Sequence, residues 1–309
     1  MQANNLFELS RLKHTESLFW LAVILAVGAV LLVPLWIFDA RELGGVSVWE
    51  KPLKFFISSA IFSFTFSWLS SYITKGSRWV KVAGLFIAIS LAVELVLIAA
   101  MAALGNTSHF NVSTLTAIVI WSLMATFISI VLFSTLFLSI MILFQKLQEF
   151  NLKLTLTLGS LNTAVGMGLA YLMTWPTATQ LANYQGIAGA HAVGVEDGGP
   201  GLPFLGWSTV AGDLRVGHFF GLHSIQVAAI LLAIALVLPS VLRVPLLIVG
   251  NFTWLGFVGL VTWQSLRAEP FSSPSQLTLT GFAVLMAVAA ASFTVLVVWQ
   301  RSRTPKQLA

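Results

Sequence analysis

Apolar residues dominate the chain in long stretches that are separated by short polar segments. A helix needs about 20 apolar residues to cross the hydrocarbon core of a bilayer, and stretches of this kind recur along the whole sequence. They cover residues 18–38, 52–73, 79–104, 114–144, 155–176, 215–238, 243–264 and 277–299. The pattern predicts an all-α polytopic membrane bundle of eight transmembrane helices, which forms a single domain over residues 1–309.

The composition excludes several classes of protein. Of the 309 residues, 58% are hydrophobic and 9% are charged, whereas a soluble domain carries about 25% charged residues. The net charge of +5 comes from basic residues that are scattered singly, so nucleic acid is not an expected partner. Because the chain has no cysteine, disulfides, thiolate metal sites and cysteine nucleophiles are excluded. The lipid bilayer is the expected surrounding.

The basic residues also predict an orientation. When the predicted connections are assigned alternately to two sides, one side receives eleven Lys and Arg residues. The other side receives only Arg41, Lys51, Lys54, Arg215 and Arg267. Positive charge marks the cytoplasmic side, so both termini are expected in the cytoplasm of a bacterial inner-membrane protein. The glycine-rich segment 177–214 would then be a long outer loop.

Four polar residues share one side of the predicted span 215–238. At about 100° per residue, an arc of about 140° contains Arg215, His218, His223 and Gln226. A surface with these groups cannot face lipid, and His223 would lie roughly 13 Å below the start of the span. This face therefore points into the bundle or into a wet cavity.

Glu94 is the only carboxylate deep inside an apolar stretch. It lies about 15 Å from the outer end of its span, which matches the depth of His223. We expect Glu94 to be protonated, or to pair with Arg215, a protonated histidine or a metal. His109, in the uncharged loop that follows this span, is expected to fold over the mouth of the site.

Lys51 and Lys54 flank Pro52 at the start of the second span. Pro52 suits the first turn of a helix, and cations beside a helix N-terminus favour an anion. Both lysines lie on the side that should be poor in positive charge, which suggests that they bind a lipid phosphate or an acidic substrate group. The alternative is that they extend to the outer headgroups without a binding role.

Three short segments carry a resemblance. They are residues 51–55 (KPLKF), residues 108–111 (SHFN), and residues 212–223, where GDLR is followed by HF and GLH. Together they resemble a group of uncharacterised bacterial multi-pass membrane proteins. The resemblance implies a bacterial inner-membrane origin and implies no activity.

The favoured function at this point is a membrane oxidoreductase or electron-transfer protein. His109, His218 and His223 would be the cofactor-binding and metal-ligating residues, because imidazole suits haem iron and transition metals such as Cu, Fe or Zn. Glu94, Arg215 and Gln226 would be the catalytic and supporting groups. One objection is that His218 and His223 lie about 140° apart on a straight helix, so one metal ion would not easily bind both.

Three alternatives remain open. A metal-dependent intramembrane hydrolase would add Asp213 to the ligands and use Glu94 as general base, but no spaced motif supports it. A permease for a small solute is the common task of such bundles, although internal repeats and spans broken near the midplane are not evident. The chain could also be a subunit of a membrane complex or a homo-oligomer.

Overall fold

The computed structural model describes residues 15–303. The helices long and apolar enough to cross a membrane are α2 (Glu16–Phe38), α3 (Glu50–Ser70), α4 (Ser77–Ala103), α5 (Leu115–Leu143), α6 (Phe150–Gly168), α10 (Ser240–Leu266) and α11 (Gln276–Arg303). Within the described part, these seven become eight if α8 (Leu214–Leu222) and α9 (Ser224–Val237) form one bent span. Each predicted stretch overlaps one of these helices, except that 215–238 overlaps both α8 and α9. Arg11, Lys13 and Lys306, which enter the charge count, lie outside the described residues.

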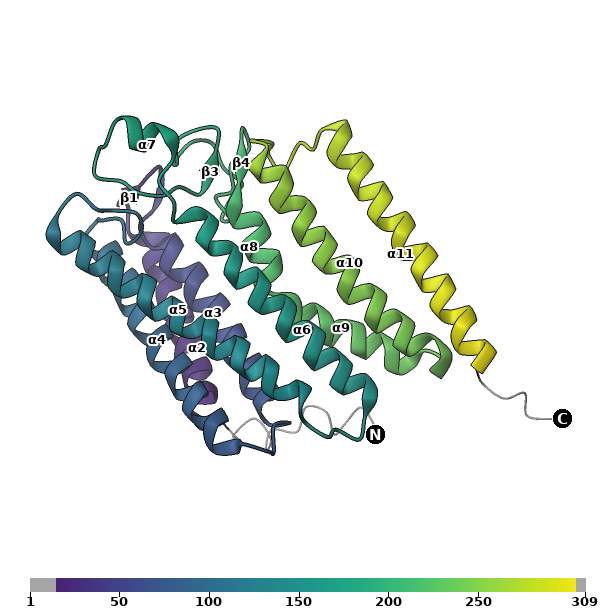
Figure 1. Cartoon of the computed structure of the whole chain (residues 1–309). Helices are drawn as coiled ribbons and strands as arrows, with labels where there is room; N and C mark the ends of the chain where they lie inside the picture. The colour runs from purple at the N-terminus through teal and green to yellow at the C-terminus, as the bar shows by residue number, and fades with distance from the viewer. Residues whose placement is uncertain (1–14, 304–309) are drawn as a thin grey trace.

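The remaining elements are short and gather at one end of the bundle (Figure 1). They are the 3-10 helix η3 (Leu169–Met173), α7 (Ala178–Ala182), and two antiparallel pairs, β1 (Glu42–Leu43) with β2 (Val46–Ser47) and β3 (Ala192–Val193) with β4 (Gly212–Asp213). We call this the loop end, and it comprises residues 39–54, 104–114, 169–215 and 267–275. The long predicted loop 177–214 is therefore an ordered cover, which the β3–β4 pairing fixes.

The helices pack in two groups that α5 joins. In the first group α2, α3 and α4 pack together, and in the second α6, α8, α9 and α10 pack together. α5 lies against α4 and α6, and α11 packs along α10 at the edge of the molecule (Figure 1). The largest cluster of buried side chains runs through both groups and includes Leu18, Phe66, Ile87, Leu138, Leu156 and Ile225.

Small residues bring α6 and α8 into contact. A Cβ atom added to Gly166 would collide with the backbone of Gly221, and one added to Gly221 would collide with Gly166. Such contacts between glycines let two helix backbones approach closely inside a membrane. The contact places the polar side of α8 beside the end of α6.

The predicted span 215–238 is not straight. α8 and α9 meet at His223 with a bend of 47°. The bend is stabilised by neighbouring side chains: Thr163 accepts the backbone N–H of Ile225 at 3.0 Å, and Trp254 donates its ring N–H to the carbonyl of Phe220 at 3.2 Å. The expectation that no span is broken was therefore wrong, because polar groups on other helices replace the lost helical hydrogen bonds.

Candidate functional site

Lys51 and His109 meet at the loop end. Lys51 lies in the first turn of α3, and its Nζ is 3.0 Å from Nδ1 of His109, which lies in the α4–α5 loop. The hydroxyl of Ser108 is 2.8 Å from the same ring nitrogen. Because an ammonium group can only donate, we assign Nδ1 of His109 as an acceptor and place its proton on Nε2. Burial first, and then the nearby charge of Lys51, holds the pKa of His109 well below its ordinary value.

Aromatic rings surround this imidazole. The ring centroids of Phe55, Phe110 and Trp121 lie 6.0, 6.1 and 5.5 Å from that of His109. The Nζ of Lys51 also lies 5.8 Å from the centroid of Phe55. An ammonium attracts the face of an aromatic ring, but a ring does not neutralise its charge.

Lys54 and Arg215 are each neutralised by a carboxylate. Nζ of Lys54 lies 2.9 Å from Glu50, and Nη2 of Arg215 lies 2.6 Å from Asp213, which is fully buried. Both cations also donate to the covering loop, at the backbone carbonyls of residues 205 and 206. Both cations anchor the loop. Their charge is already neutralised and their N–H donors are engaged, so few donors remain for an anion.

Lys51 differs from the other cations at the loop end. The pairs there are Arg41–Asp39, Lys54–Glu50, Arg215–Asp213 and Arg267–Glu269, with N–O distances of 2.7, 2.9, 2.6 and 3.6 Å. Within residues 15–303, Lys51 has no carboxylate partner of this kind, and its Nζ is hydrogen-bonded to the neutral imidazole of His109. The loop end therefore holds one half-buried cation without a counter-ion in contact.

Glu94 lies on α4 with only 5% of its surface exposed. Its Oε1 atom is buried and has no hydrogen-bond partner in the described part of the chain. Lys51 is the charged group that interacts with it electrostatically, although the two form no ion pair within contact distance. The expected partner Arg215 is bound to Asp213, because that carboxylate lies two residues away and is already held beside it.

The three polar residues of the broken span reach different partners. Nδ1 of His218 lies 2.8 Å from the carbonyl oxygen of Gly166 on α6. Nε2 of His223 lies 3.5 Å from the hydroxyl of Ser58 on α3. Gln226 donates to the hydroxyl of Thr65, also on α3, at 2.9 Å. Two of the three therefore face α3 across the bundle, as a polar inward face requires.

α3 presents its polar groups at a regular interval. Lys51, Ser58 and Thr65 follow one another at seven residues, so they share one side of the helix and are spaced by about 10 Å along its axis. We call these three residues the polar row. It extends about 21 Å from Lys51, and each member meets a polar side chain from another element, namely His109, His223 or Gln226.

His191 belongs to the same region, although its position in a glycine-rich loop does not mark it as a site residue. Its ring packs against Phe110 at 4.8 Å, and its Nδ1 lies 2.7 Å from Oδ2 of Asp197. Burial lowers the pKa of His191, and the hydrogen bond to Asp197 acts in the opposite direction. The pairing closes the loop 191–197 over the site, and only tertiary structure reveals this because no motif marks it.

The predicted metal ligands do not form one metal-binding group. Within residues 15–303, no set of three His, Asp or Glu side chains is placed to hold a metal ion. His109, His218 and His223 each bond to a different partner. The prediction of haem or a transition metal has no support from this geometry and stays a prediction.

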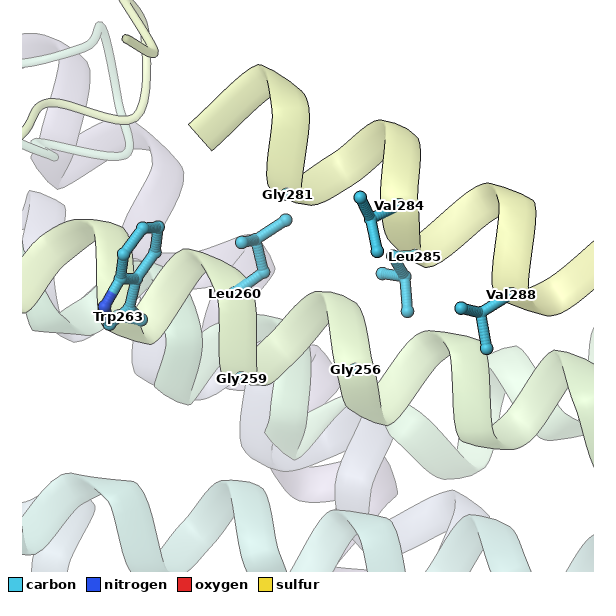
Figure 2. Close-up of a pocket in the computed structure, with 8 residues that line it drawn as sticks. All are labelled: Gly256, Gly259, Leu260, Trp263, Gly281, Val284, Leu285 and Val288. Atoms are coloured by element: carbon cyan, nitrogen blue, oxygen red, sulfur yellow. The ribbon is translucent and has the colours of Figure 1, made fainter. Parts of the chain in front are cut away.

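An apolar groove lies away from these residues, between α10 and α11. This groove of about 450 Å³ is apolar and is lined by Gly256, Gly259, Leu260, Trp263, Gly281, Val284, Leu285 and Val288 (Figure 2). It contains none of the predicted site residues. In a bilayer such a surface is a contact for lipid or for another helix.

Comparison with protein-family models, curated proteins and solved structures finds no match to this chain. The resemblance to bacterial multi-pass proteins therefore stays a prediction, and the function has to be argued from the site.

Proposed function

We propose that the chain is a bacterial inner-membrane permease for a small oxyanion, a carboxylate or a phosphate, with the loop end on the extracytoplasmic side and both termini in the cytoplasm. The orientation is supported by the excess of Lys and Arg on the opposite side. It gives the half-buried Lys51 access to solutes outside the cell.

The observation that carries the proposal is the unpaired charge of Lys51. A half-buried ammonium loses part of its hydration, and an anion in contact offsets this loss. Every other cation at the described loop end has a carboxylate within 4 Å. Since Lys51 uses one of its three N–H donors on His109, the other two remain for an oxyanion, which is the ligand that this chemistry recognises.

Transport, rather than binding alone, is supported by the path below this site. The polar row continues from Lys51 toward the membrane interior, passes the break between α8 and α9 at Ser58, and ends at Thr65, which meets Gln226. Broken helices near the midplane are a recurrent feature of transporter binding sites, and His223 stands at the break with its ring 3.5 Å from Ser58. A site that only held a lipid headgroup would need no such row.

Uptake into proteoliposomes tests this proposal. Radiolabelled acetate and inorganic phosphate are offered outside vesicles that hold the protein. Wild type should accumulate at least one of them, Lys51→Met should lose uptake, and Lys51→Arg should retain part of it. Arg41→Gln removes an exposed cation at the same end as a control and should transport normally. Equal uptake by wild type and Lys51→Met contradicts the assignment of Lys51.

A lipid ligand is distinguished by native mass spectrometry. If Lys51 holds a lipid phosphate, wild type retains bound phosphatidylglycerol, Lys51→Met loses it, and neither protein takes up solute. That result would replace the permease by a lipid-binding function.

One observation favours the redox alternative as a second candidate. Nδ1 of His218 is bonded to the backbone oxygen of Gly166, which is a common arrangement for histidines that bind a metal through Nε2. His218 could then be one axial ligand of a haem. A visible spectrum of the purified protein, with elemental analysis of the same sample, decides this: a Soret band with iron supports haem, and a colourless sample without metal removes it.

A further inference from the structure

The groove between α10 and α11 stays open between two points at which the helices touch. A Cβ atom added to Gly256 would lie 2.7 Å from the side chain of Leu285, and one added to Gly281 would lie 2.9 Å from that of Leu260. Gly259 lies between these contacts on α10, and a Cβ atom there would meet no neighbouring side chain or helix within 4 Å. The groove therefore has space at Gly259 that neither helix fills.

This space faces the membrane rather than the interior of the bundle. α11 packs mainly along α10 at the edge of the molecule, and none of its membrane-crossing segment is buried. Atoms that line an unfilled space lose van der Waals contacts, so a groove open to the bilayer is filled by a group from its surroundings. A volume of about 450 Å³ lies within the usual range for a small-molecule site.

Trp263 and Arg267 mark the loop end of the groove. Trp263 lies at one end of the lining and Val288 at the other (Figure 2). The guanidinium carbon of Arg267 lies 4.5 Å from the ring centroid of Trp263, so the cation stands directly beside a ring that lines the groove. Tryptophan at the end of a membrane span prefers the level of the lipid headgroups. The groove thus begins with a cation at the depth of the lipid phosphates.

The guanidinium of Arg267 keeps its N–H donors free. Its ion pair with Glu269 is 3.6 Å long, the longest of the four pairs that Lys and Arg form at the loop end. Glu269 instead accepts hydrogen bonds from the backbone N–H and hydroxyl of Ser275 and from the hydroxyl of Thr278. Within residues 15–303, no side-chain hydrogen bond joins Arg267 to the protein. A planar guanidinium with free donors matches the oxygens of a phosphate.

We propose that this groove is a binding site for one phospholipid of the membrane leaflet at the loop end. Its phosphate binds Arg267, and one acyl chain lies along the groove past Gly259. The groove runs about 10 Å from Trp263 to Gly256, and the hydrocarbon of one leaflet is about 15 Å deep, so the upper part of an acyl chain fills it. The proposal needs only a chain that spans a membrane and is independent of transport.

A second copy of the chain fits the groove less well. In a two-fold symmetric pair the same surface faces itself, so two grooves would lie against each other and the space at each Gly259 would stay empty. A lipid chain has the flexibility to follow the groove, and its phosphate engages the donors of Arg267 that a matching groove leaves unused.

Native mass spectrometry tests lipid binding. The full-length protein, stripped of lipid in detergent, is offered phosphatidylglycerol, phosphatidylethanolamine and diacylglycerol with the same acyl chains. Wild type should bind both phospholipids at least about tenfold more tightly than diacylglycerol, because only they carry the phosphate. A phosphatidylglycerol with a diazirine in its acyl chain should crosslink to the residues of α10 and α11 that line the groove.

Two variants test the acyl chain. Gly259→Leu fills the open space with its own side chain and should lose the crosslinks and the tight lipid. Ala287→Leu adds the same bulk on the exposed side of α11, outside the groove, and should keep both. Equal thermal unfolding of the two variants shows that the loss is not a loss of folding.

Two further variants test the headgroup. Arg267→Gln should lower the affinity for both phospholipids about tenfold or more and leave diacylglycerol unchanged. Arg41→Gln removes another cation at the loop end and should bind as wild type does. Lys51→Met should also keep this lipid, which separates the groove from the proposed anion site.

Each opposite result contradicts the proposal. Crosslinks and affinity in Gly259→Leu that equal those of wild type would show that the chain does not lie in the groove. Equal binding of diacylglycerol and phospholipid, or unchanged binding by Arg267→Gln, would remove Arg267 from the site. A dimeric wild type that Gly259→Leu converts to a monomer would show that a second copy occupies the groove instead.

Discussion

Arg215 binds Asp213, the residue two positions before it, through both Nε and Nη2, at 2.9 Å to Oδ1 and 2.6 Å to Oδ2. Asp213 is also the N-cap of α8, since it accepts the backbone N–H of Arg215. One buried carboxylate therefore starts the broken span, neutralises its first cation and holds the loop above it through the N–H of Ser208.

Asp213→Ala should destabilise the protein strongly. Removal of the carboxylate leaves the Arg215 guanidinium partly buried without its partner, a change that typically costs about 3 to 5 kcal/mol. The midpoint of thermal unfolding in detergent should fall by several degrees. The double variant Asp213→Ala with Arg215→Met should recover part of the loss, and a double variant that is less stable by the sum of the two single effects would contradict the pairing.

The Gly166–Gly221 contact predicts opposite effects for two neighbouring glycines. Gly166→Ala places a methyl group against the backbone of α8 and should cost about 1 to 3 kcal/mol, or prevent folding. Gly168→Ala, two residues later on the same helix, meets no atom within 4 Å and should be neutral or slightly stabilising. Thermal unfolding of both variants measures the difference, and equal stabilities would show that α6 and α8 are further apart.

The break at His223 depends on Thr163. Thr163→Val keeps the shape but leaves the backbone N–H of Ile225 without an acceptor, which should cost about 1 to 3 kcal/mol. Thr155→Val is the matched control, because the hydroxyl of Thr155 bonds only to its own helix at Asn151. Hydrogen exchange at residues 223–227 should rise in the first variant and not in the second.

Acidification should open the loop 191–197. Burial lowers the pKa of His191 in the folded protein, so as the pH falls below the ordinary value of 6.5 the open state takes up more protons and is favoured. Burial raises the pKa of the Asp197 carboxyl, but hydrogen bonds, first from His191, outweigh it and lower the pKa to about 2. Asp197 therefore stays ionised, and its contribution to the closed loop is lost only at far lower pH.

Hydrogen exchange measures this opening. After correction for the intrinsic dependence on pH, amides 191–197 should exchange faster at pH 5.5 than at pH 7.5. The groups that face His191 are Asp197, Arg215 and Lys51. His191→Gln should remove the dependence on pH, and Asp197→Asn should expose the loop at both values. Protection in wild type that is equal at the two pH values would contradict this explanation.

The membrane spans and the polar side of the span 215–238 were predictable from the sequence. Solvation by lipid depends only on how apolar a stretch is and on the interval at which its polar residues recur. Long apolar stretches must cross as helices, and the buried position of Glu94 follows from the cost of placing a carboxylate against lipid. The half-buried positions of His109, His218, His223 and Gln226 agree with the same argument.

The partners of these residues were not predictable from depth. Depth arithmetic suggested that Glu94 pairs with Arg215 or His223, but a carboxylate two residues away competes with any distant one, and Asp213 binds Arg215 instead. The break at His223 depends on Thr163 and Trp254, which belong to other helices. The residues around His223 alone therefore do not predict it. His191 lies beside Phe110 only because the long loop 174–213 folds back over the bundle, which the sequence does not predict.

Localisation of an oxyanion is the most direct test of the central claim, which is that the unpaired charge of Lys51 makes an anion site. Crystals of the protein are soaked in selenate, whose selenium scatters anomalously. We predict an anomalous peak with an oxygen in hydrogen-bonding distance of Lys51 Nζ, which is absent in Lys51→Met. Peaks confined to exposed cations such as Arg41, or a peak that persists at the same place in Lys51→Met, would contradict the claim.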